Sequence, residues 1–252
     1  MKKFIKENWK FLLLVLLGGL IGGYCAGLYS YDSSSGEVLR KMQEQNVTKE
    51  MLGLVSAIQY GILYGFILAC IGVFISKKVN LWKKFEFNKK SIFVTAIITI
   101  IGALILFPGD KLIFGSLSTW VNDQYNSSPT NSKIIGGLLA GGIIEEVMLR
   151  LFLMSLIVFI GSKIFYRNKE VIPVKLYIIS NIIVGIVFAA SHLPATMTMT
   201  TLTPVIVFRC FLFNVGLGIA FGYLYRKYGI GYAMISHGLV HLIADVLMLI
   251  FI

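Results

Sequence analysis

The stretch IIGGLLAGGIIEEVMLRLFLMSLIVFI, residues 134–160, is apolar except near its middle, where Glu145, Glu146 and Arg150 stand close together. A helix needs about 20 apolar residues to cross the hydrocarbon core of a bilayer, so this stretch is long enough to span it. An ionisable side chain at the bilayer centre costs at least about 2.5 kcal/mol on insertion scales. Such groups almost always face the interior of a helix bundle, and they usually mark a functional site.

The whole chain has the composition of an integral membrane protein. Of its 252 residues, 57% are hydrophobic and 14% are charged, whereas soluble domains have about 45–50% and about 25%. The fold class is therefore predicted to be all-α, a polytopic transmembrane helical bundle of about seven spans, with eight as the upper count. The predicted spans are residues 11–29, 52–76, 91–107, 134–160, 176–192, 204–225 and 232–252.

Basic residues account for the net charge of +11, and they gather in four segments outside the spans. These segments are the N-terminal tail and residues 77–90, 163–175 and 226–227. An excess of Lys and Arg in such gaps is typical of cytoplasmic loops, so the charge does not indicate a nucleic-acid partner. We expect a multi-pass protein of a cell membrane, bacterial by its Ile-, Lys- and Asn-rich composition, with its N-terminus in the cytoplasm.

Two polar motifs follow helical spacing. Glu146 and Arg150 are four residues apart, lie on one helix face and are predicted to form a structural ion pair. Glu145 is rotated by about 100° from that face, so it stays free to act as a general base. His237 and His241 are also four residues apart, so both rings are expected to project from one face.

The third histidine of the chain, His192, ends the fifth predicted span. Phe188 precedes it by one helical turn and can pack on its ring. Asp245 lies one turn beyond His241, close enough to the C-terminus to reach interfacial water. If the acid and the histidines converge, they supply a base for water and donors for an oxyanion, which is the minimum for amide hydrolysis.

Glycines four residues apart occur in three of the predicted spans, and such faces let membrane helices approach closely. We interpret them as packing residues, not functional ones. The pairs are Gly18/Gly22, Gly19/Gly23, Gly137/Gly141 and Gly218/Gly222.

At its polar motifs the chain resembles the CPBP family, bacterial relatives of the type II CAAX prenyl endopeptidases that are also called Abi or CAAX-protease-like proteins. That family has EExxxR on one membrane helix, FxxxH on the next, and HxxxN or a similar pair on a late helix. The matching residues here are Glu145-Glu146 to Arg150, Phe188 to His192, and His237 to His241. His241 stands where the family more often has Asn, and the first three spans carry no motif.

The resemblance implies an intramembrane endopeptidase whose substrate is a membrane-bound peptide or protein that reaches the site from the lipid bilayer. We favour a glutamate-type mechanism without a cofactor, in which Glu145 activates water, His192 helps to hold it, and His237 and His241 stabilise the oxyanion. Glu146, Arg150 and Phe188 are supporting residues. The alternative mechanism is that of a metalloprotease with zinc bound by Glu145, His192 and His237.

The resemblance also divides the single membrane domain into N-terminal helices and loops, residues 1–133, and a catalytic core, residues 134–252. A non-catalytic immunity or scaffold protein, such as one for bacteriocin self-immunity, is the alternative function. The sequence indicates no oligomeric state.

Depth along the membrane poses a difficulty for this site. At 1.5 Å per residue, Glu145 lies about 20 Å below the outer surface of a core about 30 Å thick, and His192 about 28 Å above the inner surface. These depths do not meet. We therefore expect either a fifth helix that starts near Ile178, or helices that tilt or break, with Pro194 to Thr203 as a partly re-entrant segment.

Overall fold

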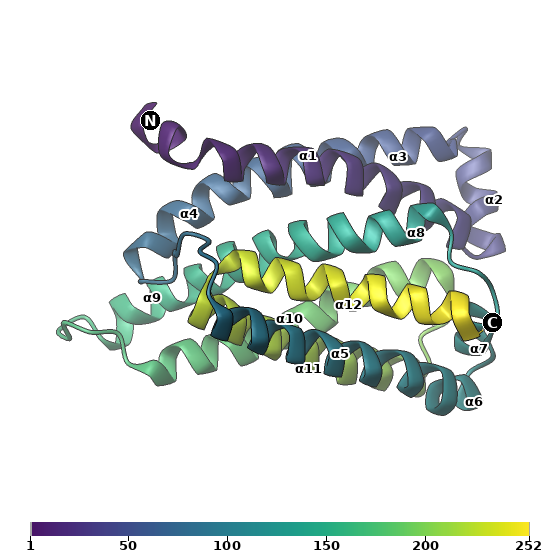
Figure 1. The fold of residues 1–252 in the computed structure, drawn as a ribbon. Helices are drawn as coiled ribbons and strands as arrows, with labels where there is room; N and C mark the ends of the chain where they lie inside the picture. Colours follow the sequence, from purple (N-terminus) through teal and green to yellow (C-terminus); the bar gives the residue numbers. More distant parts are fainter. Residues whose placement is uncertain (1, 252) are drawn as a thin grey trace.

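The computed structural model describes residues 2–251, and in it the helices run side by side as one bundle (Figure 1). Six helical segments are long and apolar enough to cross a membrane: Phe4–Ser33, Lys49–Lys78, Lys89–Leu117, Val174–Met199, Pro204–Tyr228 and Ile230–Phe251. The remaining predicted span, 134–160, lies inside an unbroken helical segment that covers residues 131–165. The prediction of an all-α bundle of about seven spans is confirmed. Ile252, the predicted end of the last span, lies outside the described residues.

The first part of the chain contributes three long helical segments. They are α1 (Lys2–Ser33); α3 (Lys49–Ile58) with η1 (Gln59–Ile67) and α4 (Leu68–Lys78); and α5 (Lys89–Pro108) with η2 (Gly109–Phe114) and α6 (Gly115–Leu117). The short helix α2 (Gly36–Glu44) follows the first of them, and the short helix α7 (Thr119–Tyr125) follows the third. The η segments are π-helical, which means that their N–H groups bond to carbonyls five residues back.

The second part begins with the segment that carries the two glutamates. Its elements are α8 (Asn131–Gly136), η3 (Gly137–Glu145), η4 (Val147–Met154), α9 (Ser155–Phe165), α10 (Val174–Met199), α11 (Pro204–Tyr228) and α12 (Ile230–Phe251). Glu146 lies between η3 and η4, so π-helical winding surrounds it on both sides. Such turns inside helices occur frequently at functional sites.

α10 is one continuous helix that passes through Pro194. The expectations of a start near Ile178 and of a re-entrant segment after Pro194 are both wrong. Polar side chains next to the proline donate to helix carbonyls: Ser191 Oγ to Phe188 O at 2.8 Å, and Thr196 Oγ1 to His192 O at 2.9 Å. These bonds tie polar side chains to the helix backbone on both sides of the proline, and α10 continues to Met199.

α1 packs against two neighbours through its glycines. A Cβ on Gly22 would lie 2.5 Å from the Ala140 nitrogen in η3, and a Cβ on Gly19 would lie 2.5 Å from the Tyr60 carbonyl oxygen in η1. Real Cβ atoms do not approach this closely, so only glycine allows these contacts. The packing interpretation of the Gly18/Gly22 and Gly19/Gly23 pairs is confirmed. α1 packs directly against η3, the helical segment that ends in Glu145.

α12 lies in the middle of the bundle, where it contacts α5 on one side and η3 on the other (Figure 1). Its crossing with η3 is a glycine contact, because a Cβ on Gly142 would lie 2.6 Å from Gly238 Cα. Gly142 is three residues from Glu145, and Gly238 follows His237. This crossing therefore brings the glutamates next to the α12 histidines.

Candidate active site

Glu146 and Arg150 form the predicted ion pair inside the bundle, with both side chains fully buried. Arg150 Nη1 lies 3.0 Å from Glu146 Oε1, and Arg150 Nη2 donates to the carbonyl oxygen of Gly218 at 2.9 Å. The guanidinium also lies 4.8 Å from the ring centre of Phe188, a cation–π contact that desolvation strengthens. The pair therefore joins the helix of the glutamates to α10 and α11.

Glu146 also fixes the tautomer of His237. His237 Nδ1 lies 2.8 Å from Glu146 Oε1, and because a carboxylate paired with arginine only accepts, Nδ1 carries the proton and donates it. In the neutral ring the other nitrogen, Nε2, is then an acceptor. His241 Nε2 lies 3.2 Å from it, so His241 is the donor in this second bond.

Glu145 projects away from the ion pair, as its rotation predicts, and one quarter of its side chain is exposed. Its two oxygens face different rings: Oε1 lies 4.0 Å from His192 Nε2, and Oε2 lies 3.8 Å from His237 Nε2. His192 Nδ1 donates to the Phe188 carbonyl at 2.8 Å, which leaves its Nε2 free and turned toward Glu145. The depths that seemed incompatible in the sequence do meet in the structure.

Aromatic rings hold the imidazoles in place. Phe188 packs edge-on against His192 with ring centres 4.7 Å apart, as their spacing predicts. The ring of Phe221 on α11 stacks on His237 at 4.5 Å. Phe221 carries no signal in the sequence, since it is one of 18 phenylalanines in the chain.

Three of the predicted packing glycines also make room for the polar cluster. A Cβ on Gly137 or Gly141 would lie 3.2 Å from atoms of His241, and one on Gly218 would lie 3.1 Å from Arg150 Nη2. The four-residue spacing of these glycines is visible in the sequence, but the sequence does not say which side chain each glycine lies against.

Asp245 differs from its prediction, because it pairs with Lys133 at 3.1 Å and its side chain is nearly buried. The expectation that it reaches interfacial water is wrong, since the helix of the glutamates begins beside the end of α12 and places a cation there.

The predicted zinc ligands do not fit a metal ion as they are arranged. Zinc needs three or more protein ligands at about 2.0–2.2 Å with their lone pairs directed at it. The Nε2 lone pair of His237 instead accepts the bond from His241. Within residues 2–251, no group of three or more His, Cys, Asp or Glu side chains is placed to hold a metal.

Residues 128–243 match the family model described as type II CAAX prenyl endopeptidase Rce1-like. The match includes every side chain of the cluster: Glu145, Glu146, Arg150, Phe188, His192, His237 and His241. No curated protein and no solved structure matches the chain significantly. The resemblance inferred from the three motifs is confirmed, and the match supports an intramembrane protease of the CAAX type. Residues 128–243 of this multi-pass membrane protein form an Rce1-like type II CAAX prenyl endopeptidase domain.

Proposed function

We propose that the protein hydrolyses a peptide bond of a membrane-associated peptide or protein with Glu145 as the general base. The observation that carries this proposal is the 4.0 Å gap between Glu145 Oε1 and His192 Nε2. Both atoms are acceptors, because the other ring nitrogen of His192 already donates to the Phe188 carbonyl. A water molecule that donates one O–H to each acceptor fits between them.

Hydrolysis then follows from the position of this water. Glu145 removes a proton as the water oxygen attacks the carbonyl carbon of the scissile bond, and the negative charge moves to the carbonyl oxygen. Glu145 returns the proton to the amide nitrogen as the C–N bond breaks, which leaves a carboxylic acid and an amine. The acid then passes its remaining proton to the amine, so the products are a carboxylate and an ammonium group. His192 orients the water throughout.

The hydrogen-bond directions favour unequal roles for the two α12 histidines. His237 Nε2 is an acceptor in the neutral cluster, so His241 Nε2–H is the available donor for the oxyanion. We assign His241 to this role, in which it turns from His237 to the developing charge. His237 holds His241 in position beforehand, and it is itself fixed by Glu146 and by the ring of Phe221.

The test is cleavage of a membrane peptide by purified variants in bilayers. Glu145→Gln and His192→Ala are expected to abolish cleavage while the protein still inserts and keeps its melting temperature, because both side chains are partly exposed and make few direct bonds. Cleavage that survives both substitutions would contradict the proposal. An immunity or scaffold role predicts instead that biological activity persists in Glu145→Gln.

We also propose that the N-terminus lies in the cytoplasm. Three of the basic segments meet at one end of the bundle: Lys77 lies 3.8 Å from Glu7, and Lys83 Nζ donates to the carbonyls of Arg226 and Lys227 at 2.9 and 2.7 Å. Segments that cluster in this way share one side of the membrane, and their Lys and Arg content favours the cytoplasmic side. Labelling of single cysteines introduced at residues 84 and 128 tests the assignment, since only residue 128 is expected to react from outside intact cells.

A further inference from the structure

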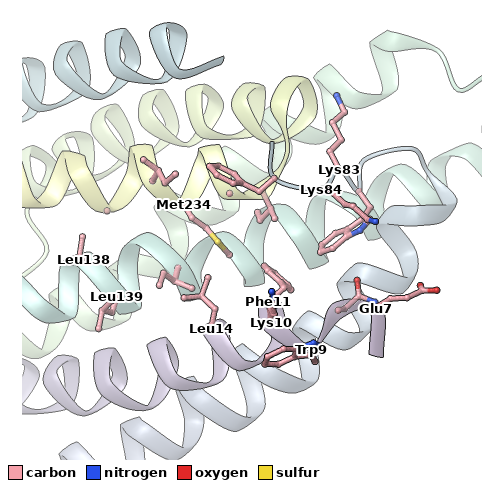
Figure 2. Close-up of a pocket in the computed structure, with 18 of the residues that line it drawn as sticks. Glu7, Trp9, Lys10, Phe11, Leu14, Lys83, Lys84, Leu138, Leu139 and Met234 are labelled. Carbon is pink, nitrogen blue, oxygen red and sulfur yellow. The ribbon is translucent and has the colours of Figure 1, made fainter. Parts of the chain in front are cut away.

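A groove of about 1060 Å³ lies between α1, η3 and α12 (Figure 2). Leu138, Leu139 and Ile143 line it from η3, and Met234 and Leu239 line it from α12. Gly238, which makes the glycine crossing between α12 and η3, also lines the groove, whereas Glu145 and the three histidines do not.

The groove opens toward the space that lipid would occupy. Large apolar side chains at its rim are substantially exposed: Trp9 by 50%, Leu14 by 52% and Ile235 by 42%. Exposed apolar groups within a span are in contact with the acyl chains of the bilayer. A lipid molecule can therefore enter this groove from the side.

One end of the groove is strongly basic, and Figure 2 shows Lys83 and Lys84 there, at a distance from Leu138 and Leu139. Lys6 and Lys10 of α1 also line the groove, and the ring of the adjacent Phe11 packs on Trp82, next to Lys83, with ring centres 5.2 Å apart. The single acid in the lining, Glu7, lies in an ion pair with Lys77. None of the ion pairs among residues 2–251 includes Lys6, Lys10 or Lys84.

Lys83 lies beside other cations at this end of the groove. Its Nζ caps the C-terminal carbonyls of α11, a favourable position for a cation. Even so, partial burial and the neighbouring Lys227 and Arg226 lower the pKa of Lys83. An anion bound at this end would relieve the repulsion.

We propose that the groove binds an anionic phospholipid, with an acyl chain along the walls from η3 and α12 and the phosphate on Lys6, Lys10 and Lys84. The charge pattern selects this occupant, because a phospholipid has one anionic end and an apolar remainder. An extended peptide would leave its backbone N–H and C=O groups without partners along the apolar walls. Basic pockets between membrane helices on the cytoplasmic side bind anionic headgroups in this manner.

The test is lipid retention by the full-length protein, measured by native mass spectrometry with phosphatidylglycerol and phosphatidylcholine of identical acyl chains. The wild type is expected to retain phosphatidylglycerol preferentially. Each lysine near an anionic headgroup contributes about fivefold in affinity, so Lys6→Gln with Lys84→Gln is expected to weaken phosphatidylglycerol binding roughly 25-fold. Ile235→Trp, which fills the groove, is expected to weaken binding of both lipids.

Matched controls lie nearby on the same protein. Lys89→Gln with Lys90→Gln removes two charges near the same end but outside the groove, and Ile100→Trp enlarges a residue on α5 that is 52% exposed. Both controls are expected to bind like the wild type. Equal retention of the two lipids by the wild type, an equal loss in the lysine control, or unchanged binding in Ile235→Trp would each overturn the proposal. Because the readout is binding, none of these outcomes depends on proteolysis.

Discussion

The bundle contains two arginine–carboxylate pairs whose carboxylates are fully buried, and the two pairs differ in how completely they are hydrogen-bonded. Asp110 is fully buried, and both its oxygens accept bonds: Arg209 donates through Nε and Nη2, and the Tyr125 hydroxyl donates at 2.8 Å. In the other pair, one oxygen of Glu146 serves both Arg150 and His237. Among residues 2–251, Glu146 Oε2 and two nitrogens of Arg150 have no hydrogen-bond partner.

This difference indicates that the Asp110–Arg209 pair is structural, whereas the Glu146–Arg150 pair belongs to the candidate active site. Two desolvated charges stabilise a fold only when their remaining lone pairs and protons are also satisfied. The Asp110 network meets that condition and ties α11 to η2 and α7. The Glu146 network does not meet it, and its carboxylate accepts a hydrogen bond from His237. We infer that the second pair is retained for the orientation of His237.

The largest expected effect is on catalysis. Glu145→Gln is expected to reduce the rate of peptide cleavage about 10²–10⁴-fold, the range for loss of a general base. Asp110→Asn, a carboxylate-to-amide change in the Arg209 network, is expected to leave the rate unchanged. Cleavage rates of the purified variants in identical bilayers check both expectations. An equal loss of rate in the two variants would show that the Glu145 carboxylate has no special role in cleavage.

The next effect is on stability. Arg150→Met leaves Glu146 as an uncompensated buried charge, so we expect the free energy of unfolding to fall by about 3–5 kcal/mol. Denaturation in mixed detergent micelles measures it. Glu145→Gln is the control, and a similar destabilisation there would show that the two glutamates are not differentiated.

Asp110→Asn is expected to destabilise the protein less, by about 1.5–3 kcal/mol, the value of a hydrogen bond to a charged group. The reason is that 23% of the Arg209 side chain is exposed, so water can solvate the unpaired cation. The same denaturation experiment provides the comparison with Arg150→Met. A larger loss in Asp110→Asn would reverse the ranking.

Phe221→Leu removes the ring stacked on His237 and is expected to cost about 0.5–1.5 kcal/mol beyond the lost buried area. The turnover number should fall more than the substrate affinity, because the ring acts through its contacts with His237 and Arg150. Phe208→Leu on the same helix alters a side chain that is 61% exposed and serves as the control. An unchanged turnover number in Phe221→Leu would remove Phe221 from the positioning residues.

The smallest expected effect is that of a chelator. Since the His237 lone pair is engaged by His241, cleavage is expected to persist after dialysis against a zinc chelator. A zinc endopeptidase treated in parallel shows that chelation was complete. Loss of cleavage that added zinc restores would instead support the metalloprotease mechanism.

Local patterns in the sequence predicted a large part of this protein. Hydropathy placed the spans, because the thickness of the hydrocarbon core sets their length. The Glu146–Arg150 pair and the Phe188–His192 contact were also predicted, since partners four residues apart are neighbours on any helix. The depths of Glu145 and His192 in the membrane were predicted poorly. They were counted from assumed ends of the spans, and the helical segment 131–165 is longer than a span needs to be.

The sequence by itself therefore determined that the protein is a membrane helical bundle with three polar motifs inside it, because apolar length and helical periodicity are local properties of the chain. Only the tertiary structure decided that Glu146 takes His237, that His241 bonds to His237, and that Asp110 joins Arg209. Glu146 and His237, and Asp110 and Arg209, are far apart in the sequence. His237 and His241 are only four residues apart, but the sequence does not say which ring nitrogens bond to each other. Which of them meet depends on how closely glycine faces let the helices approach, and that is a property of the packed bundle.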